Sequence, residues 1–454
     1  MLNKKRNLFS IGAALLFMLI SSAQIFATGG AEEIATPTGF YAILVIVPLL
    51  VIVALLFLKV DMLAAGFVGG TIAMLIGGIG LAEANEQFLS TIPGMLSITV
   101  PIINSAIAMA VFKSGGYTSA LALVRRKIGN KNEYVAAFIV ILQAAATYMS
   151  GIGGGSAMVI APLAMAAVGA IPELIAAMSI ASAVAFTTSP ASLESGIVSK
   201  ISGVPVAEYV AEMRLFTLVF VVLSVILGFY GAKKRKTLFK GEENEEFAKL
   251  SDGELFRITI PAIFMLAAVI VGPFINDAIG MSLFNPLMYT VVTVLLIFVC
   301  TKFSMNESLE AVVDGSTYIL TRLFAVGIFL SFINIIGDTG AFQVIAGIAE
   351  KAPSAFVVPA AVVAGILIGI PAGAYVGSIL GLILPVVAAL NFSPVALGFV
   401  AMGVGLGSQL SFVNITMQAL SAGFQLPIIQ VVKGNGKWVG MSMVLLLVLS
   451  YFFG

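Results

Sequence analysis

The sequence predicts an all-α polytopic membrane protein, and three observations carry this prediction. Of its 454 residues, 60% are hydrophobic and only 10% are charged, whereas soluble domains carry about 25% charged residues. Apolar runs at 40–58 and 284–301 approach the length of a membrane span, because a helix needs about 20 apolar residues to cross a bilayer. These runs do not alternate apolar and polar residues, as the strands of a membrane barrel would.

The composition also argues against several classes of function. A net charge of +1 gives no reason to expect a nucleic-acid partner. With Cys300 as the single cysteine and no histidine, we expect no disulfide, no zinc site and no cofactor. An enzyme is not expected because no nucleophile–base pair stands out. The sequence lacks the glycine-rich phosphate loop of an ATP-driven pump and the carbonyl or charged filter of a channel.

The N-terminal segment has the three parts of a secretory signal. Basic residues at 4–6 precede an apolar stretch at 8–27, and a small, polar segment follows at 28–33. An uncleaved first span of similar length is the alternative. We therefore treat 1–30 as a signal peptide or an extra N-terminal span, and both alternatives place its end outside.

The positions of lysine and arginine predict how the chain crosses the membrane. Counting from outside, 19 of the 23 basic residues fall on the inner side and three on the outer side, and Arg322 falls within a span. This is the bias of cytoplasmic loops in bacterial-type inner membranes, where we expect this multi-pass chain. The expected spans are 40–58, 62–82, 96–113, 174–202, 212–231, 256–274, 284–302, 313–335, 394–424 and 438–453, with half-span pairs at 133–149 and 156–170, and at 355–370 and 375–390.

The two halves of the chain repeat a series of glycine and proline landmarks. The landmarks are the glycine-rich stretches 151–156 and 373–378, each followed by two prolines, Pro162 and Pro172 in the first half and Pro385 and Pro394 in the second. We expect two transport repeats, at 31–232 and 256–454, joined by a cytoplasmic linker at 233–255. Each repeat has five spans, a re-entrant hairpin and a broken helix. An odd number of spans inverts the second repeat, which is typical of secondary transporters with a site near the midplane.

Each expected hairpin has a glycine-rich tip. Non-helical backbone at membrane depth occurs only where it is buried in protein or lines a water-filled cavity, so both tips are candidate substrate-binding segments. Tight helix packing is the alternative use of such small residues. The candidates are Ser150, Gly151, Gly153, Gly154, Gly155 and Ser156 in tip 1 (150–156), and Gly373, Tyr375, Gly377 and Ser378 in tip 2 (371–378).

Each repeat also contains a polar interruption in a long apolar run. Pro190 breaks the first helix, and a break leaves a half-helix N-terminus that favours anions. The hydroxyls could donate to a carboxylate, released carbonyls could hold Na⁺, or the hydroxyls could simply bond back to helical carbonyls. The candidates are Thr187, Thr188, Ser189 and Ser192 in break 1 (187–192), and Ser408, Gln409, Ser411, Asn414 and Thr416 in break 2 (408–416).

Two ionisable residues lie within the expected spans, where charged groups are costly and often functional. Glu194 follows break 1 and could bind a coupling proton or cation. Arg322 could balance the charge of an anion. The alternatives are that Glu194 sits at an outer, water-filled mouth and that Arg322 snorkels or pairs with Asp314.

At these motifs the sequence resembles the Dcu-type C4-dicarboxylate carrier family, within the ion-transporter superfamily. The resemblance runs from about 40 to 450 and is strongest from Gly115 through 151–155 to 181–192. It implies a substrate held between hairpin tips and helix breaks, and a possible homodimer. The sodium-symporter branch of the superfamily carries Ser-Asn-Thr at both breaks, whereas break 1 reads Thr-Ser-Pro-Ala-Ser and break 2 contains Val-Asn-Ile-Thr. Na⁺ or H⁺ therefore remains open as coupling ion.

Together these observations predict a secondary active transporter of small organic anions that works by alternating access. The resemblance implies C4-dicarboxylates as substrates. One alternative is a cation/proton antiporter of the same superfamily. Another is the large membrane subunit of a tripartite (TRAP-like) carboxylate transporter, which would need partner subunits. The expected partners are otherwise the small organic anion and the lipid bilayer.

Overall fold

The structure, a computed structural model, describes residues 36–96, 99–128, 131–235, 247 and 249–454. Every regular element in these ranges is a helix, so the all-α prediction is confirmed. Six of the described helices are long and apolar enough to cross a membrane, or seven if α6 and α7, which meet at 56°, form one bent span. The expected signal peptide or first span at 1–30 lies outside the described residues.

The described helices lie on both sides of the expected linker. The first half contains α2 (Gly39–Leu44), α3 (Val47–Phe57), α4 (Met62–Gly77), α5 (Leu81–Leu96), α6 (Thr99–Lys113), α7 (Gly116–Ile128), α8 (Asn132–Ser150), α9 (Gly153–Val168), α10 (Pro172–Thr187), α11 (Leu193–Ser202) and α12 (Val206–Arg235). The second half contains α14 (Asp252–Ile279), α15 (Pro286–Cys300), α16 (Met305–Asp338), α17 (Ala341–Ala346), η1 (Ser354–Phe356), α18 (Val357–Ala372), α19 (Val376–Ala388), α20 (Pro394–Ser408), α21 (Ile415–Gly423) and α22 (Ile428–Phe453).

From the hairpins onward, the second half repeats the order of helices in the first. The hairpin α8–α9 corresponds to α18–α19, and the broken helix α10–α11 corresponds to α20–α21. The long closing helix is α12 in one half and α22 in the other. Both predicted breaks are present, because the first helix stops at Thr187 and resumes at Leu193, and the second stops at Ser408 and resumes at Ile415.

Several boundaries differ from the sequence-based prediction. The expected span 62–82 ends at Gly77, where Gly78 adopts a left-handed conformation. An amphipathic helix, α5, then fills a stretch for which no element was predicted, because its acidic residues interrupt the apolar pattern. The expected span 313–335 begins earlier, since a Ser304–Glu307 capping box starts α16.

Helices also enter two segments that were expected to be loops. α12 extends to Arg235 and α14 begins at Asp252, so the expected linker 233–255 is shorter at both ends. α22 begins directly after Pro427 and includes Lys433 and Lys437, which were placed in a loop. Charge alone marks these ends poorly, because lysine and arginine are good helix formers.

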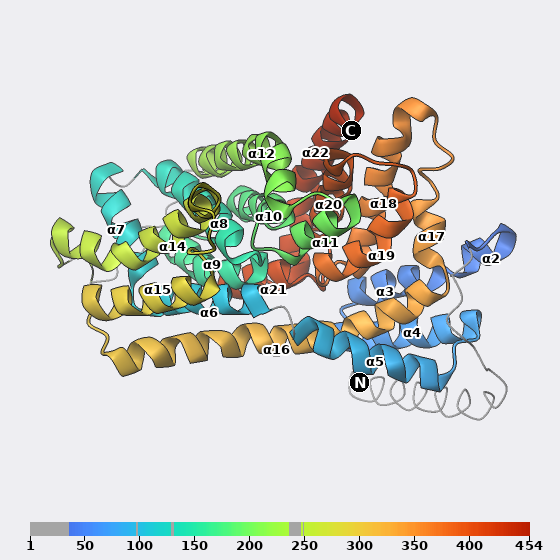
Figure 1. Cartoon of the computed structure of the whole chain (residues 1–454), viewed down its shortest axis with the longest axis horizontal. Helices are drawn as coiled ribbons and strands as arrows, with labels where there is room; N and C mark the ends of the chain where they lie inside the picture. The colour runs from blue at the N-terminus through green and yellow to red at the C-terminus, as the bar shows by residue number, and fades with distance from the viewer. Residues whose placement is uncertain (1–35, 97–98, 129–130, 236–246, 248) are drawn as a thin grey trace.

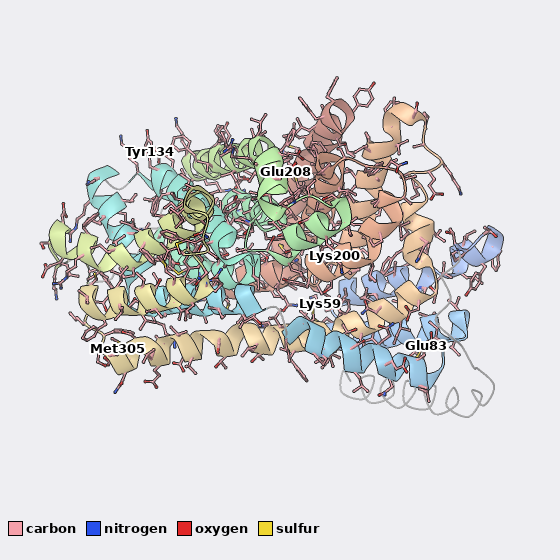
Figure 2. All side chains as sticks on the ribbon, viewed as in Figure 1. Lys59, Glu83, Tyr134, Lys200, Glu208 and Met305 are labelled. Atoms are coloured by element: carbon pink, nitrogen blue, oxygen red, sulfur yellow. The ribbon has the colours of Figure 1, made fainter. Side chains whose placement is uncertain are left out.

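α16 packs lengthwise against α4, α5 and α6 (Figure 1). Figure 2 places Met305, at the start of α16, and Glu83, near the start of α5, at opposite ends of this side of the molecule. Gly66 and Gly70 allow α4 to approach α16 closely. A Cβ on Gly66 would lie 2.9 Å from Phe329, and a Cβ on Gly70 would lie 2.7 Å from Phe332. The hairpins and broken helices lie beyond this layer, with α9 against α21 and α11 against α19.

The inverted repeat makes a prediction about membrane sidedness. Lys200 precedes the α11–α12 junction, Lys433 follows the corresponding α21–α22 junction, and both are exposed. In a Cys300→Ser background, we expect Lys200→Cys to react with a membrane-impermeant maleimide from outside intact cells. Lys433→Cys should react only after the membrane is opened. Labelling of both cysteines from the same side would contradict the inversion.

Candidate functional site

One small, mostly buried cavity lies where both tips and both breaks meet. Its volume is about 10 Å³, which is room for about one water molecule. All four predicted motifs, or the residues next to them, contribute to its wall. The lining residues are Gly151, Ile152 and Gly153 from tip 1, Phe186 and Glu194 around break 1, Ala374, Tyr375 and Val376 from tip 2, and Asn414, Ile415 and Thr416 from break 2.

Four helices begin beside this cavity. They are α9 and α19, which begin within the two tips, α11, which directly follows break 1, and α21, which begins within break 2. The tips, expected to be non-helical, are so only at 151–152 and 373–375. A helix N-terminus carries about half a positive charge and free amide groups. The only ionisable carboxyl among the lining residues is that of Glu194. The geometry therefore combines several anion-attracting helix ends with one carboxyl group.

Tip 1 packs against both breaks so closely that only glycine fits. Gly151 has a left-handed φ of 70°, and a Cβ on it would lie 2.5 Å from the carbonyl oxygen of Ala191. A Cβ on Gly153 would lie 2.6 Å from Oγ1 of Thr416. These contacts explain the dense glycines of tip 1, because a larger residue would push the tip away from the breaks.

Asn414 joins break 2 to tip 2. Its Oδ1 accepts hydrogen bonds from the amides of Thr416 at 2.9 Å and Met417 at 3.1 Å, which caps α21. Its Nδ2 donates to the carbonyl oxygen of Gly373 at 2.9 Å. A Cβ on Gly373 would lie 2.6 Å from Cβ of Ser408. One side chain therefore both starts a half-helix and holds the neighbouring tip.

Glu194 makes the corresponding link between break 1 and tip 2. The amide of Gly377, in the first turn of α19, donates to Oε1 of Glu194 at 3.0 Å. Glu194 is only 2% exposed, so it does not lie at an open, water-filled mouth. Its Oε2 and the hydroxyl of Tyr375 are buried, and neither has a hydrogen-bond partner within the described part of the chain.

Most of the predicted hydroxyls lie near the cavity but do not line it. In break 1, Thr187 and Thr188 donate back to helical carbonyls of Ala183 and Val184. Ser192 instead caps α11 by accepting from the amide of Ser195 at 3.1 Å. In this conformation these groups stabilise the break itself, which is the structural use that such residues often have.

Ser189 and the first part of break 2 behave in the same way. Ser189 donates to the carbonyl oxygen of Tyr148 at 2.6 Å and so fastens break 1 to α8. Ser408 donates back to Gly405 at 2.7 Å, and Ser411 accepts from Val413 at 3.4 Å. Gln409 accepts at Oε1 from Ser179 at 3.1 Å, which ties break 2 to α10.

The remaining polar residues of the tips are held within or beside the hairpins. Ser156 shares a buried network with Gln143, Thr147 and Ser182, in which the shortest contact joins Thr147 and Ser156 at 2.6 Å. Ser150 donates within tip 1 to Ile152. Further contacts place Gly155 against Ser105 of α6 and Ser378 against Met95 of α5.

Arg322 does not line the cavity but touches the helix that follows break 2. Its Nη1 donates to Oε1 of Gln418 at 3.2 Å, which connects α16 to α21. Asp314, the alternative partner considered from the sequence, instead accepts from Nζ of Lys113 at 2.7 Å.

Sequence reasoning missed the apolar wall of the cavity. Ile152, Phe186, Val376 and Ile415 all line it, yet such residues are ordinary core residues by type. Their only signal is position, because each lies within two residues of a predicted glycine, hydroxyl or amide.

Comparison with known proteins leaves the family open. No family model and no curated protein matches the chain. Thirteen chains of solved structures do match. One belongs to a structure described as the Alcanivorax borkumensis YdaH transporter with an unusual topology. The two chains share 15% of their residues, and the TM-score is 0.48. The match covers 91% of this chain and 98% of that chain. At this similarity, the function of the present chain has to be argued from its own residues.

The two roles of Asn414 predict an unusually large effect on stability. We expect Asn414→Ala to destabilise the fold by about 3 kcal/mol, because it removes a helix cap and leaves a buried carbonyl without its donor. Asn285 caps α15 at a more exposed position, so Asn285→Ala should cost about 1 kcal/mol. Thermal unfolding of the purified variants measures both, and equal losses would argue against the tip-to-break link.

Proposed function

We propose that this chain is a secondary active transporter that carries small organic anions by alternating access. The observation that carries the proposal is the meeting of four half-helix N-termini, two from each inverted repeat, around one buried cavity. The resemblance to Dcu-type carriers adds C4-dicarboxylates as the substrate class to test first.

The free amides beside the cavity support an anionic substrate. The first turn of α9 consists of Gly153, Gly154 and Gly155, and no side chain caps it. Amides at such an N-terminus suit a carboxylate, and the helix dipole adds to the attraction. Thr416 brings a hydroxyl to the same place. These groups can hold an anion without a basic residue in the cavity wall.

The division of the site between the two repeats supports transport rather than static binding. Every lining residue belongs to a hairpin tip or a helix break or lies within two residues of one, and both repeats contribute. With about 10 Å³ of space, the cavity must open before an organic anion enters, which requires the tips and breaks to move apart. Inverted repeats with interrupted helices open such sites to one side at a time.

Glu194 supports coupling of transport to a cation. A buried ionised carboxylate is costly unless it is paired, so proton or Na⁺ binding to Glu194 would favour the closed site. The oxygens of Glu194 and Thr416 are suitable Na⁺ ligands. Arg322, through Gln418, would balance the charge of the anion from α16.

The position of Glu194 also favours a second candidate function, the cation/proton antiporter. There the carboxyl group would bind the transported ion itself. A tripartite carrier remains a third candidate, and it would need partner subunits for transport.

The test is uptake of labelled succinate and fumarate by proteoliposomes that contain only this chain. We expect uptake that depends on internal dicarboxylate, on a Na⁺ gradient or on a proton gradient, and each result identifies one coupling mode. Gradient-driven cation exchange without anion uptake would favour the antiporter. No uptake by verified, folded protein would contradict transport of dicarboxylates by the chain alone.

A glycine variant tests whether the tip takes part in uptake. Gly153→Ala should lower uptake at least tenfold, because its Cβ would lie 2.6 Å from Oγ1 of Thr416 and force tip 1 from break 2. Gly436→Ala is the matched control, since a Cβ there meets nothing within 4 Å. Equal uptake by the two variants would remove tip 1 from the mechanism.

A further inference from the structure

The two helices that follow the hairpin tips begin with the same backbone geometry. Ile152, before α9, has φ −132° and ψ 115°, and Tyr375, before α19, has φ −140° and ψ 115°. Gly154 and Gly377 are then the second residues of their helices. The amides of Gly154 and Gly377 are therefore equivalent in backbone position, each one residue beyond a residue that lines the cavity, Gly153 and Val376.

The helices that face these amides are equivalent as well. A Cβ on Gly377 would lie 2.9 Å from Leu193, the first residue of α11, and a Cβ on Gly154 would lie 3.0 Å from Ile415, the first residue of α21. The next residue in each helix lines the cavity. It is Glu194 in α11 and Thr416 in α21, so a carboxyl group in one repeat corresponds to a hydroxyl in the other.

This difference gives the two equivalent amides different surroundings. Gly377 donates to the carboxyl group of Glu194 at 3.0 Å. Gly154 packs against Ile415, and Gly153, the residue before it, lies against the shorter, uncharged side chain of Thr416. No side chain caps α9. The contact shows that the amide of Gly377 donates to a carboxyl oxygen at a helix N-terminus, where anions are favoured.

We propose that Glu194 is a built-in occupant of one of two equivalent carboxylate subsites, and that a dicarboxylate has to displace it whereas a monocarboxylate does not. The subsite at Gly154 and Thr416 takes the first carboxylate of either anion. The inference rests on the proposed transport of organic anions and adds to it a residue that determines substrate charge.

The hydroxyl of Tyr375 provides independent support. This residue lines the cavity beside Glu194 and is 3% exposed. Its hydroxyl is buried and, among the described residues, has no hydrogen-bond partner, although buried polar groups are normally paired. A substrate carboxylate that replaced Glu194 at Gly377 would give this donor an acceptor close by.

The test compares two four-carbon anions, succinate with two carboxylates and butyrate with one, by calorimetric binding to the purified full chain. We expect Glu194→Thr, which copies the residue of the other repeat, to raise the succinate-to-butyrate affinity ratio at least tenfold. Glu194→Gln should raise it less, because its amide oxygen can still accept from Gly377. Glu208→Gln, at an exposed position on α12 (Figure 2), should leave the ratio unchanged.

Each contrary outcome has a distinct meaning. If the wild-type chain binds either anion but Glu194→Thr leaves the ratio unchanged, Glu194 is not an occupant of a substrate subsite. Equal increases for the Thr and Gln variants would mean that charge alone matters, which also overturns the inference. Binding of neither anion by the wild type or any variant would overturn the proposed function with it. Glu194→Ser replaces the Thr variant if that one does not fold.

Discussion

The arrangement depends on one constraint, which is that a helix interrupted inside an apolar protein must satisfy the backbone groups that the interruption frees. Asn414 and Ser192 cap the helices that restart after the breaks, and Glu194 accepts from the first turn after tip 2. Each unsatisfied group would cost on the order of several kcal/mol in a membrane. The first turn of α9, which has no side-chain cap, is therefore the natural place for an external acceptor.

The interrupted helices of both repeats meet at a single place. Tip 1 touches break 1 through Gly151 and Ala191 and break 2 through Gly153 and Thr416. Tip 2 touches break 2 through Gly373 and Ser408, and it touches Leu193, the residue directly after break 1, through Gly377. Because these contacts require glycine, each tip lies directly against the breaks. Movement of one tip or break would therefore shift the segments that contact it, as alternating access requires.

The sequence allowed much of this to be predicted, because the signals were physical. Pro190 and the glycines of tip 1 mark two of the interruptions, because such residues disfavour a regular helix, and the polar residues of break 2 mark a third. Gly153, Gly154 and Gly155 nevertheless form the first turn of α9. The sequence could not reveal α5, because its acidic and other polar residues interrupt the apolar pattern, as they would in a surface loop. It also could not tell that Thr187 and Thr188 would bond back to their own helix, since a hydroxyl has the same appearance in either use.

The contact partners of Glu194 and Arg322 were equally hidden from sequence reasoning. Gly377 lies 183 residues from Glu194 in the chain, and Gln418 lies 96 residues from Arg322. Pairings over such separations follow from the tertiary packing of the repeats. Only the structure distinguishes the carboxyl group that lines the cavity from the guanidinium group that lies outside it.

We propose that the tips and breaks of both repeats form one substrate site that opens to each side of the membrane in turn. Substrate protection of a cysteine at Thr416 tests it most directly, in a Cys300→Ser background, because Thr416 lines the cavity and is 1% exposed. We expect slow labelling by a small maleimide in proteoliposomes, and severalfold slower labelling when a transported anion saturates the site. Labelling that the anion leaves unchanged, in a variant that still transports it, would contradict the account.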